Sequence, residues 1–195
     1  MQVEDILKHE FSSIEEAIEN SNYKKRISFL LQNPSLGCKS ICKLGGYYEQ
    51  SSNCFGTTVF LVDGEKAFLR REDCKIKDNA IFVRKPKATD FCVFPYEERP
   101  GYIDPKFMEW FLKDRCVKLS ELEKDCIIAT TGILIDNEER SKGYGLLHTC
   151  VYLGSILGKP WVFHQKSEGK HYEAVPLREF WNVEKTEYYQ YPRVQ

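Results

Sequence analysis

Residues 147–164 read Leu-His-Thr-Cys-Val-Tyr-Leu-Gly-Ser-Ile-Leu-Gly-Lys-Pro-Trp-Val-Phe-His and contain two of the chain's four histidines. β-branched and aromatic residues dominate both ends of this stretch, and a turn with two glycines, 154–159, separates them. The pattern predicts two antiparallel strands joined as a hairpin. His148 opens the first strand and His164 closes the second. A hairpin brings these side chains near one another if both face the same side.

The rest of the chain divides into helices first and strands afterwards. Residues 3–31 read as helical, with Ser12 or Ser13 as an N-cap. A further helix is expected around residues 105–112. Short apolar runs predict additional strands at residues 81–83, 91–94, 126–130 and 132–135. This order predicts an α+β architecture with an antiparallel sheet in a single domain, 1–195, with a helical N-terminal extension at residues 1–36.

Composition excludes some classes of function. The chain has 195 residues and a formal net charge of −1, with 28 basic and 29 acidic residues evenly mixed. No basic stripe stands out, so nucleic-acid binding is not expected. No apolar run approaches the roughly 18 residues of a spanning helix, and residues 1–8 lack the order of a signal peptide. We therefore expect a cytoplasmic protein without membrane attachment, and leave export by a signal-independent route open. The oligomeric state is not predicted.

Eight cysteines are many for a chain of this length. Most of them stand beside apolar residues, where a free cysteine behaves as a small hydrophobe. We expect a reduced protein, because no secretory signal accompanies them. The single close pair, Cys38 and Cys42, has no second pair at zinc-ligand spacing. No metal or organic cofactor is expected.

Residues 54–62, Cys-Phe-Gly-Thr-Thr-Val-Phe-Leu-Val, can be interpreted as a helix or as the first arm of a hairpin. In the helical interpretation, which we adopt, Asn53 is a good N-cap and Cys54 lies at the helix start. Unpaired N–H groups and the helix dipole favour a thiolate there. The same groups can donate to the oxyanion of a tetrahedral intermediate. Gly56 has no side chain, which leaves room at this turn for a substrate to approach.

Five segments occur in an order that resembles the NlpC/P60 peptidases. They are 44–46 (Leu-Gly-Gly), 53–56 (Asn-Cys-Phe-Gly), 122–129 (Leu-Glu-Lys-Asp-Cys-Ile-Ile-Ala), 148–154 (His-Thr-Cys-Val-Tyr-Leu-Gly) and 162–164 (Val-Phe-His). The family has a Gly-Gly step, a cysteine motif that opens a helix, a Gly-Asp-hydrophobic strand, a histidine strand and a strand that ends in a third polar residue. The order of the segments, more than any one of them, carries the resemblance.

The resemblance implies a papain-like fold, with a catalytic core over residues 43–180. It also implies that Cys54 attacks an acyl carbon, that His148 is the base and then the acid, and that His164 orients His148. His171 is the alternative third member. The implied substrate is a peptide or another amide, with cell-wall peptides the family's usual target. Deamidation and acyl transfer use the same residues, and a non-catalytic binding module on the same fold is the rival interpretation.

The chain departs from the family pattern in several places. Asn53 replaces an aspartate, Phe55 replaces a small residue and Lys124 replaces a glycine. Three segments are longer than their family counterparts or have none: residues 70–105, 136–145 and 155–160. These departures leave the substrate open.

Other polar and aromatic residues are interpreted as structural. Asp104, Asp125 and Asp136 are isolated carboxylates, expected at turns or strand ends. The aromatic residues 180–181 and 188–191 are expected in core and edge packing.

Overall fold

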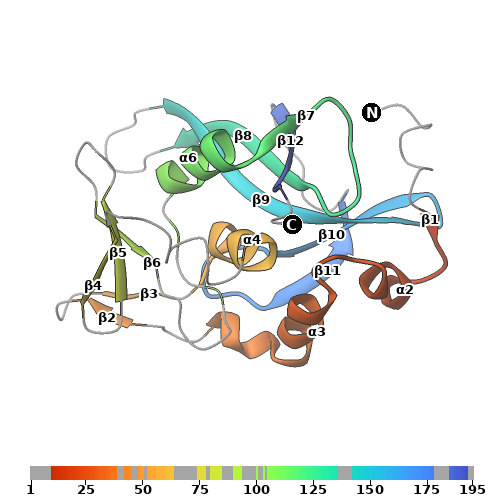
Figure 1. Ribbon diagram of the computed structural model, residues 1–195, viewed down its shortest axis with the longest axis horizontal. Helices are drawn as coiled ribbons and strands as arrows, with labels where there is room; N and C mark the ends of the chain where they lie inside the picture. The colour runs from red at the N-terminus through yellow and green to blue at the C-terminus, as the bar shows by residue number, and fades with distance from the viewer. Residues whose placement is uncertain are drawn as a thin grey trace.

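The computed structural model describes residues 10–38, 42–44, 48–50, 52–63, 74–77, 80–84, 90–93, 100, 103, 105–135, 142–177 and 185–192. Several expectations lie outside these residues: the Gly45–Gly46 step, Asp104, residues 136–141 and residues 180–181. The described part is α+β, as predicted, with helices and a mainly antiparallel sheet (Figure 1).

The largest sheet among the described residues has seven strands, and six of them follow the order β11-β10-β9-β8-β12-β7. Its strands are β1 (Glu10–Phe11), β7 (Val117–Leu119), β8 (Ile127–Ile135), β9 (Lys142–Ile156), β10 (Lys159–Gln165), β11 (Tyr172–Pro176) and β12 (Lys185–Gln190). All neighbours are antiparallel except β1, which pairs in parallel with the end of β9. Two small antiparallel sheets accompany it: β2 (Cys42–Leu44) with β3 (Tyr48–Gln50), and β4 (Cys74–Lys77) with β5 (Ala80–Arg84) and β6 (Asp90–Val93).

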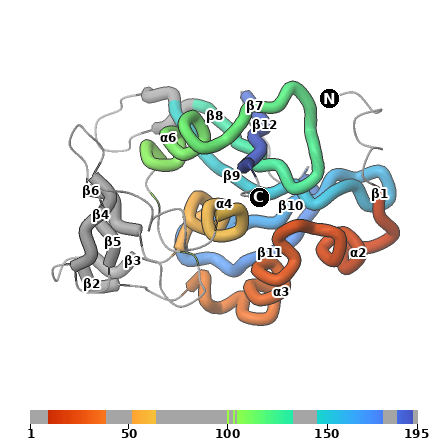
Figure 2. The backbone as a smooth tube through the Cα atoms, in the orientation of Figure 1, coloured from red at the N-terminus to blue at the C-terminus, as the bar shows by residue number. Residues whose placement is uncertain are grey.

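The described helices pack against this sheet and share one apolar core with it. They are α2 (Ile14–Glu19), α3 (Lys24–Gln32), the short 3-10 helix η2 (Pro34–Cys38), α4 (Cys54–Val62) and α6 (Pro105–Arg115). Helix α4 packs on β9 and β10 and lies between α6 and α3 in the view of Figure 2. A second, smaller cluster includes Cys150, Tyr152 and Val162. No described helix has the length and apolar character needed to cross a membrane.

The helical interpretation of residues 54–62 is correct, and burial explains why local sequence left it ambiguous. Every residue of α4 is buried. A helix that is apolar all round belongs inside a protein and shows little amphipathic period. Asn53 is extended, with φ −131° and ψ 178°, and its side chain accepts from the N–H of Gly56. The predicted N-cap therefore begins the helix.

The N-terminal region is less helical than predicted. Residues 10–11 form β1, and α2 and α3 are separate short helices. Ser13 is the N-cap of α2, and the carboxylate of Glu16 accepts from Ser12. Pairing of β1 with β9 is a tertiary contact, which local helix propensity cannot foresee.

Asp125 joins the two N-terminal helices to the sheet. It sits in a turn just before β8 with φ 63° and is 2% exposed. Its carboxylate accepts from the hydroxyl of Ser21 at 2.5 Å and from the N–H of Asn22 at 2.8 Å. The predicted turn position is correct. The carboxylate accepts both hydrogen bonds from the segment that connects α2 to α3.

The turn between β9 and β10 is shorter than the predicted 154–159. Leu157 and Gly158, with φ 51° and 70°, form the whole turn. Positive φ at both central residues matches the strand twist of a two-residue hairpin. Residues expected in the loop are therefore paired, with Lys159 opposite Ile156 and Pro160 opposite Ser155.

The C-terminal aromatic residues pack as expected. Strand β12 lies between β8 and β7, and Tyr188 is opposite Ile128 on one side and Leu119 on the other. Tyr191 stacks on Phe111 of α6, with ring centroids 5.5 Å apart and an interplanar angle of 4°.

Candidate active site

The side chain of Asn53 joins the start of α4 to residue 103. Its Oδ1 accepts from the N–H of Gly56 at 2.9 Å and from the N–H of Ile103 at 3.3 Å. Its Nδ2 donates to the carbonyl of Ile103 at 2.8 Å. An ionised aspartate has no donor for that carbonyl. Asparagine at this position therefore ties the helix start to residue 103 through both an acceptor and a donor.

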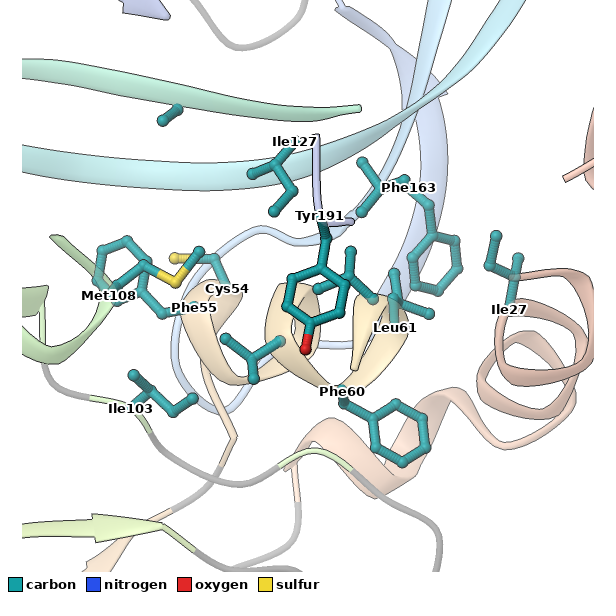
Figure 3. Close-up of a cluster of buried hydrophobic side chains, with 14 of the residues drawn as sticks. Ile27, Cys54, Phe55, Phe60, Leu61, Ile103, Met108, Ile127, Phe163 and Tyr191 are labelled. Carbon is teal, nitrogen blue, oxygen red and sulfur yellow. The ribbon is translucent and has the colours of Figure 1, made fainter. Parts of the chain in front are cut away.

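Cys54 is the first residue of α4 and lies in the main apolar cluster. The residue is 6% exposed, and Figure 3 shows it at one end of the cluster with Phe55, Ile103 and Met108. Burial raises the pKa of the Cys54 thiol to about 11, whereas hydrogen bonds from backbone groups, foremost those of Thr149 and Phe55, lower it. The expected lowering at the helix start is present, but desolvation outweighs it. At neutral pH the buried residue is therefore a neutral thiol.

Strand β9 holds the start of α4 through the residue that follows His148. The hydroxyl of Thr149 lies 2.9 Å from that of Thr58 and 3.5 Å from the carbonyl of Cys54. The Thr149 backbone also interacts with the Cys54 thiol. Thr149, Val151 and Leu153 thus form the face of β9 that packs on α4, whereas strand alternation places His148 on the opposite face, with Cys150 and Tyr152. A direct contact between the thiol and the imidazole stays a prediction.

The two histidines of the hairpin meet directly. His148 Nε2 and His164 Nδ1 are 2.9 Å apart, with the rings at an interplanar angle of 79°. His164 is completely buried and His148 is half-buried. His171, the alternative partner, is exposed just before β11. The histidine that the structure joins to His148 is therefore His164.

A β-bulge precedes His148. Thr130 of β8 is opposite His148, and Thr131 is opposite Leu146, so Leu147 is the extra residue in β9. A bulge bends its strand and redirects the next side chain. This irregularity helps to aim His148, and the alternating pattern of residues 147–153 gives no sign of it.

Glu173 extends the histidine pair to a third strand. It lies directly opposite His164 in the β10–β11 ladder, and its Oε1 is 3.2 Å from His164 Nε2. Its side chain is 42% exposed. Sequence reasoning missed Glu173 because the register of β11 depends on the turn at residues 166–171. The available signal was that Glu173 is the single charged residue within residues 172–177.

Both histidines have a low pKa. Burial lowers that of His148 to about 4. Burial also lowers that of His164 to about 3, with further lowering from the charges of His148 and Lys166. At neutral pH each ring is uncharged and has one N–H and one lone pair.

Gln165 holds the loop that leads into Cys54. It is fully buried, and its Oε1 accepts from the hydroxyls of Ser52 at 2.8 Å and Thr57 at 3.1 Å. Its Nε2 donates to the carbonyls of Lys170 at 2.7 Å and Gly37 at 3.1 Å. One satisfied amide therefore ties β10 to both sides of the nucleophile. Local sequence holds no cue to this role, because Gly37, Ser52 and Thr57 are far from Gln165 along the chain.

No cluster of three or more metal-binding side chains occurs among the residues that the structure describes. Within the same residues, Cys38 is exposed and Cys54, Cys126 and Cys150 are buried free thiols. Comparison of the chain with protein-family models, with curated proteins and with solved structures finds no match in any of the three.

Proposed function

We propose that the protein is a cysteine hydrolase of the papain-like, NlpC/P60 type that cleaves a peptide or other amide bond. Cys54 is the nucleophile, His148 the base and His164 the residue that orients it. The observation that supports this proposal is the His148–His164 hydrogen bond on strands β9 and β10, whose opposite face packs against the helix that begins at Cys54. Nucleophile, base and orienting group are the parts of a catalytic triad.

The chemistry begins from neutral groups. Because the thiol has a raised pKa and His148 a lowered one, a resting thiolate–imidazolium pair is disfavoured. His148 takes the thiol proton as sulfur bonds to the acyl carbon. It then gives that proton to the departing amine as the C–N bond breaks. Water, deprotonated by His148, hydrolyses the thioester and releases the acid.

Backbone N–H groups at the start of α4 supply the oxyanion site. The first N–H groups of a helix lack partners within the helix. Those of Cys54 and Phe55 lie at the thiol, where both lower its pKa. Donors of this kind stabilise the negative charge of a tetrahedral intermediate.

Substrate entry requires the cover over Cys54 to open. Ile103 and Met108 are 1% and 0% exposed and belong to the same apolar cluster as the thiol. We infer that α6 and residue 103 move together when an extended amide substrate binds. A cell-wall peptide is the substrate suggested by the resemblance, and a reducing cytoplasm is the compartment that suits a free thiol.

The rival is a binding module that keeps the fold without catalysis. The burial of Cys54 favours it, since a thiol that never opens to solvent cannot attack a substrate. Deamidation and acyl transfer are variants of the proposed chemistry, differing in the leaving group or the acceptor.

Iodoacetamide labelling, followed by peptide mass spectrometry, tests the proposal. Exposed Cys38 is the reference for a free thiol, and buried Cys126 and Cys150 are the references for inert ones. We expect Cys54 to be labelled well above the inert pair, and this excess to be lost in His148→Ala but kept in His171→Ala. Labelling of Cys54 only at the level of Cys126 and Cys150 would contradict the catalytic proposal and favour the binding module.

A further inference from the structure

We propose that two copies of this chain form a symmetric dimer, in which the tip of the β9–β10 hairpin of each copy enters an apolar groove between α2 and α3 of the other. Leu157 of the tip fills the groove, and Lys159 pairs with Glu15 at the rim of the groove. Neither feature includes Cys54 or the histidine pair, so the dimer is independent of the proposed hydrolase.

The tip of the hairpin carries an apolar side chain at a costly backbone position. Leu157 has φ 51°, and it is 82% exposed, more than any other large hydrophobic residue that the structure describes. A two-residue turn of this kind favours asparagine or glycine, and leucine at positive φ is a steric outlier. Because so little of the side chain is buried, it gains little packing within one copy that could offset the strain. Packing against a second copy would offset it.

The groove between α2 and α3 has a volume of about 420 Å³. Its lining is mainly apolar: Ile14 and Ile18 come from α2, Leu31 from α3 and Ala174 from β11. Ile14 and Leu31 are only partly buried, so a side chain from outside would remove further apolar surface from water. A groove of this size and lining can take an aliphatic side chain such as that of Leu157.

The charge at the rim of the groove is opposite to the charge at the tip. Glu15 and Glu19 of α2 line the groove, and both are exposed. Glu19 forms an ion pair with Lys24 at 3.5 Å, whereas Glu15 has no ion pair with any described residue. Lys159 is exposed and follows Leu157 by two positions. A leucine in the groove therefore brings a cation close to the rim carboxylate, and this complementarity selects a second copy as the occupant.

Tip and groove lie at the same end of the molecule, which allows a closed pair. Strand β1 connects them: it pairs with the end of β9, and the carboxylate of Glu10 accepts from the N–H of Gly158 in the turn at 2.9 Å. Helix α2 begins three residues after β1 and packs on β9 (Figure 1). Each copy can therefore give its tip and receive its partner's tip across one two-fold axis. A tip and a groove at opposite ends would form an open chain instead.

Sedimentation of the full chain over a range of concentrations tests the dimer. We expect a monomer–dimer equilibrium with a dissociation constant on the order of micromolar, since the interface is small. Leu157→Asn should raise this constant at least about tenfold. It should also raise the urea midpoint of the dilute monomer, because asparagine tolerates positive φ. Val117→Asn, at another exposed apolar residue, is the matched control and should leave the equilibrium unchanged.

A charge swap locates the contact. Lys159→Glu and Glu15→Lys, both at exposed positions, should each weaken the dimer, because each places like charges at the rim. An equimolar mixture of the two variants should regain the wild-type affinity as a heterodimer. In that heterodimer each tip meets a groove of opposite charge, which can happen only if the contact is between copies.

Three results would overturn the inference. One is a wild type that stays monomeric up to about 500 µM, which would leave the groove to another occupant, such as a basic helical peptide. Another is a Leu157→Asn variant that dimerises as tightly as the wild type. The third is a mixture of the charge variants that associates no more tightly than either variant alone. Growth beyond the dimer with rising concentration would contradict the closed, reciprocal arrangement.

Discussion

Cys54 and His148 have pKa values shifted in opposite directions, and burial is the main cause of both shifts. Desolvation disfavours a charge on either residue, so the proton stays on the sulfur of Cys54 and His148 stays neutral. Helix-start N–H groups oppose this at Cys54 but do not overcome it. Under the proposed mechanism the proton therefore moves during attack, in contrast to a preformed ion pair.

The pH dependence of kcat/KM follows from the low pKa of His148. A base must be unprotonated, and His148 loses its proton above about pH 4. We expect kcat/KM to fall below about pH 4 and to stay level from there to neutrality. The measurement is ester hydrolysis across this range at constant ionic strength, with stability monitored in parallel. An acidic limb near the ordinary histidine pKa of about 6.5 would contradict burial as the controlling factor.

His164 should matter for turnover far more than His171. His164→Ala removes the partner of His148 Nε2, so we expect kcat to fall about 100-fold or more. His171→Ala, at an exposed position, is the matched control and should retain wild-type kcat. Equal losses in the two variants would point to a structural effect and remove His164 from the triad. Steady-state kinetics measures both.

At the level of elements, the start of α4 and residue 103 form one hydrogen-bonded unit. Asn53 caps α4 and also binds both backbone groups of Ile103. A movement of residue 103 therefore acts directly on the turn that carries Cys54.

Asn53→Asp tests that coupling. The substitution keeps a capping oxygen, loses the donor to Ile103 and places a charge where the residue is 7% exposed. We expect the free energy of unfolding to fall by about 1–3 kcal/mol, measured by urea denaturation. Gln32→Glu, at an exposed position of α3, adds the same charge at the surface; it is the control and should change the free energy of unfolding by less than about 0.5 kcal/mol. A neutral Asn53→Asp would show that the double contact with Ile103 contributes nothing.

Met108→Ala tests whether α6 covers the nucleophile. Truncation of this fully buried side chain leaves a cavity beside the thiol and costs about 2–5 kcal/mol. We expect faster alkylation of Cys54 under native conditions. Leu112→Ala, a buried truncation on the same helix, controls for general destabilisation. Equal acceleration in both variants would mean that unfolding, not uncovering, exposes the thiol.

Some elements could be predicted because their signals are local. The N-cap and apolar run of α4 and the aromatic helix α6 are of this kind. The Leu157–Gly158 turn and strand β1 could not be predicted, because leucine rarely adopts positive φ and β1 exists only through pairing with β9. The bulge at Leu147 likewise depends on its partner strand.

Stability of the whole molecule should depend on pH through its buried histidines. His148 and His164 have folded pKa values of about 4 and about 3, below the unfolded value of about 6.5. Between these values the unfolded chain binds more protons, so stability is present above pH 6.5 and is lost as pH falls through the folded pKa values. Each histidine contributes a slope of at most about 1.4 kcal/mol per pH unit.

Urea denaturation from pH 7 to pH 5 measures this slope. We expect the free energy of unfolding to fall with pH in the wild type, and to fall less in a His148→Gln, His164→Gln double variant. Carboxylates titrate mostly below pH 5, so they contribute little to the difference in slope between the two proteins. Parallel curves for the two proteins would contradict the neutral, buried state of the pair.

The sequence placed the two histidines on neighbouring strands of a hairpin, where they meet only if both face the same side, and it separated Cys54 from the other cysteines by its helix-start position. It did not disclose Glu173, Gln165 or the Asn53–Ile103 contact, since each depends on the register or packing of distant segments. It also predicted a more acidic thiol, because local N–H groups are visible in a sequence and burial is not.

The most direct test of the central claim is intact-protein and peptide mass spectrometry after brief exposure to p-nitrophenyl acetate. We predict a burst of p-nitrophenol, with one acetyl group on Cys54 that is absent in Cys54→Ala and strongly reduced in His148→Ala. Acetyl groups scattered over lysines, with the same p-nitrophenol release in Cys54→Ala, would contradict the account.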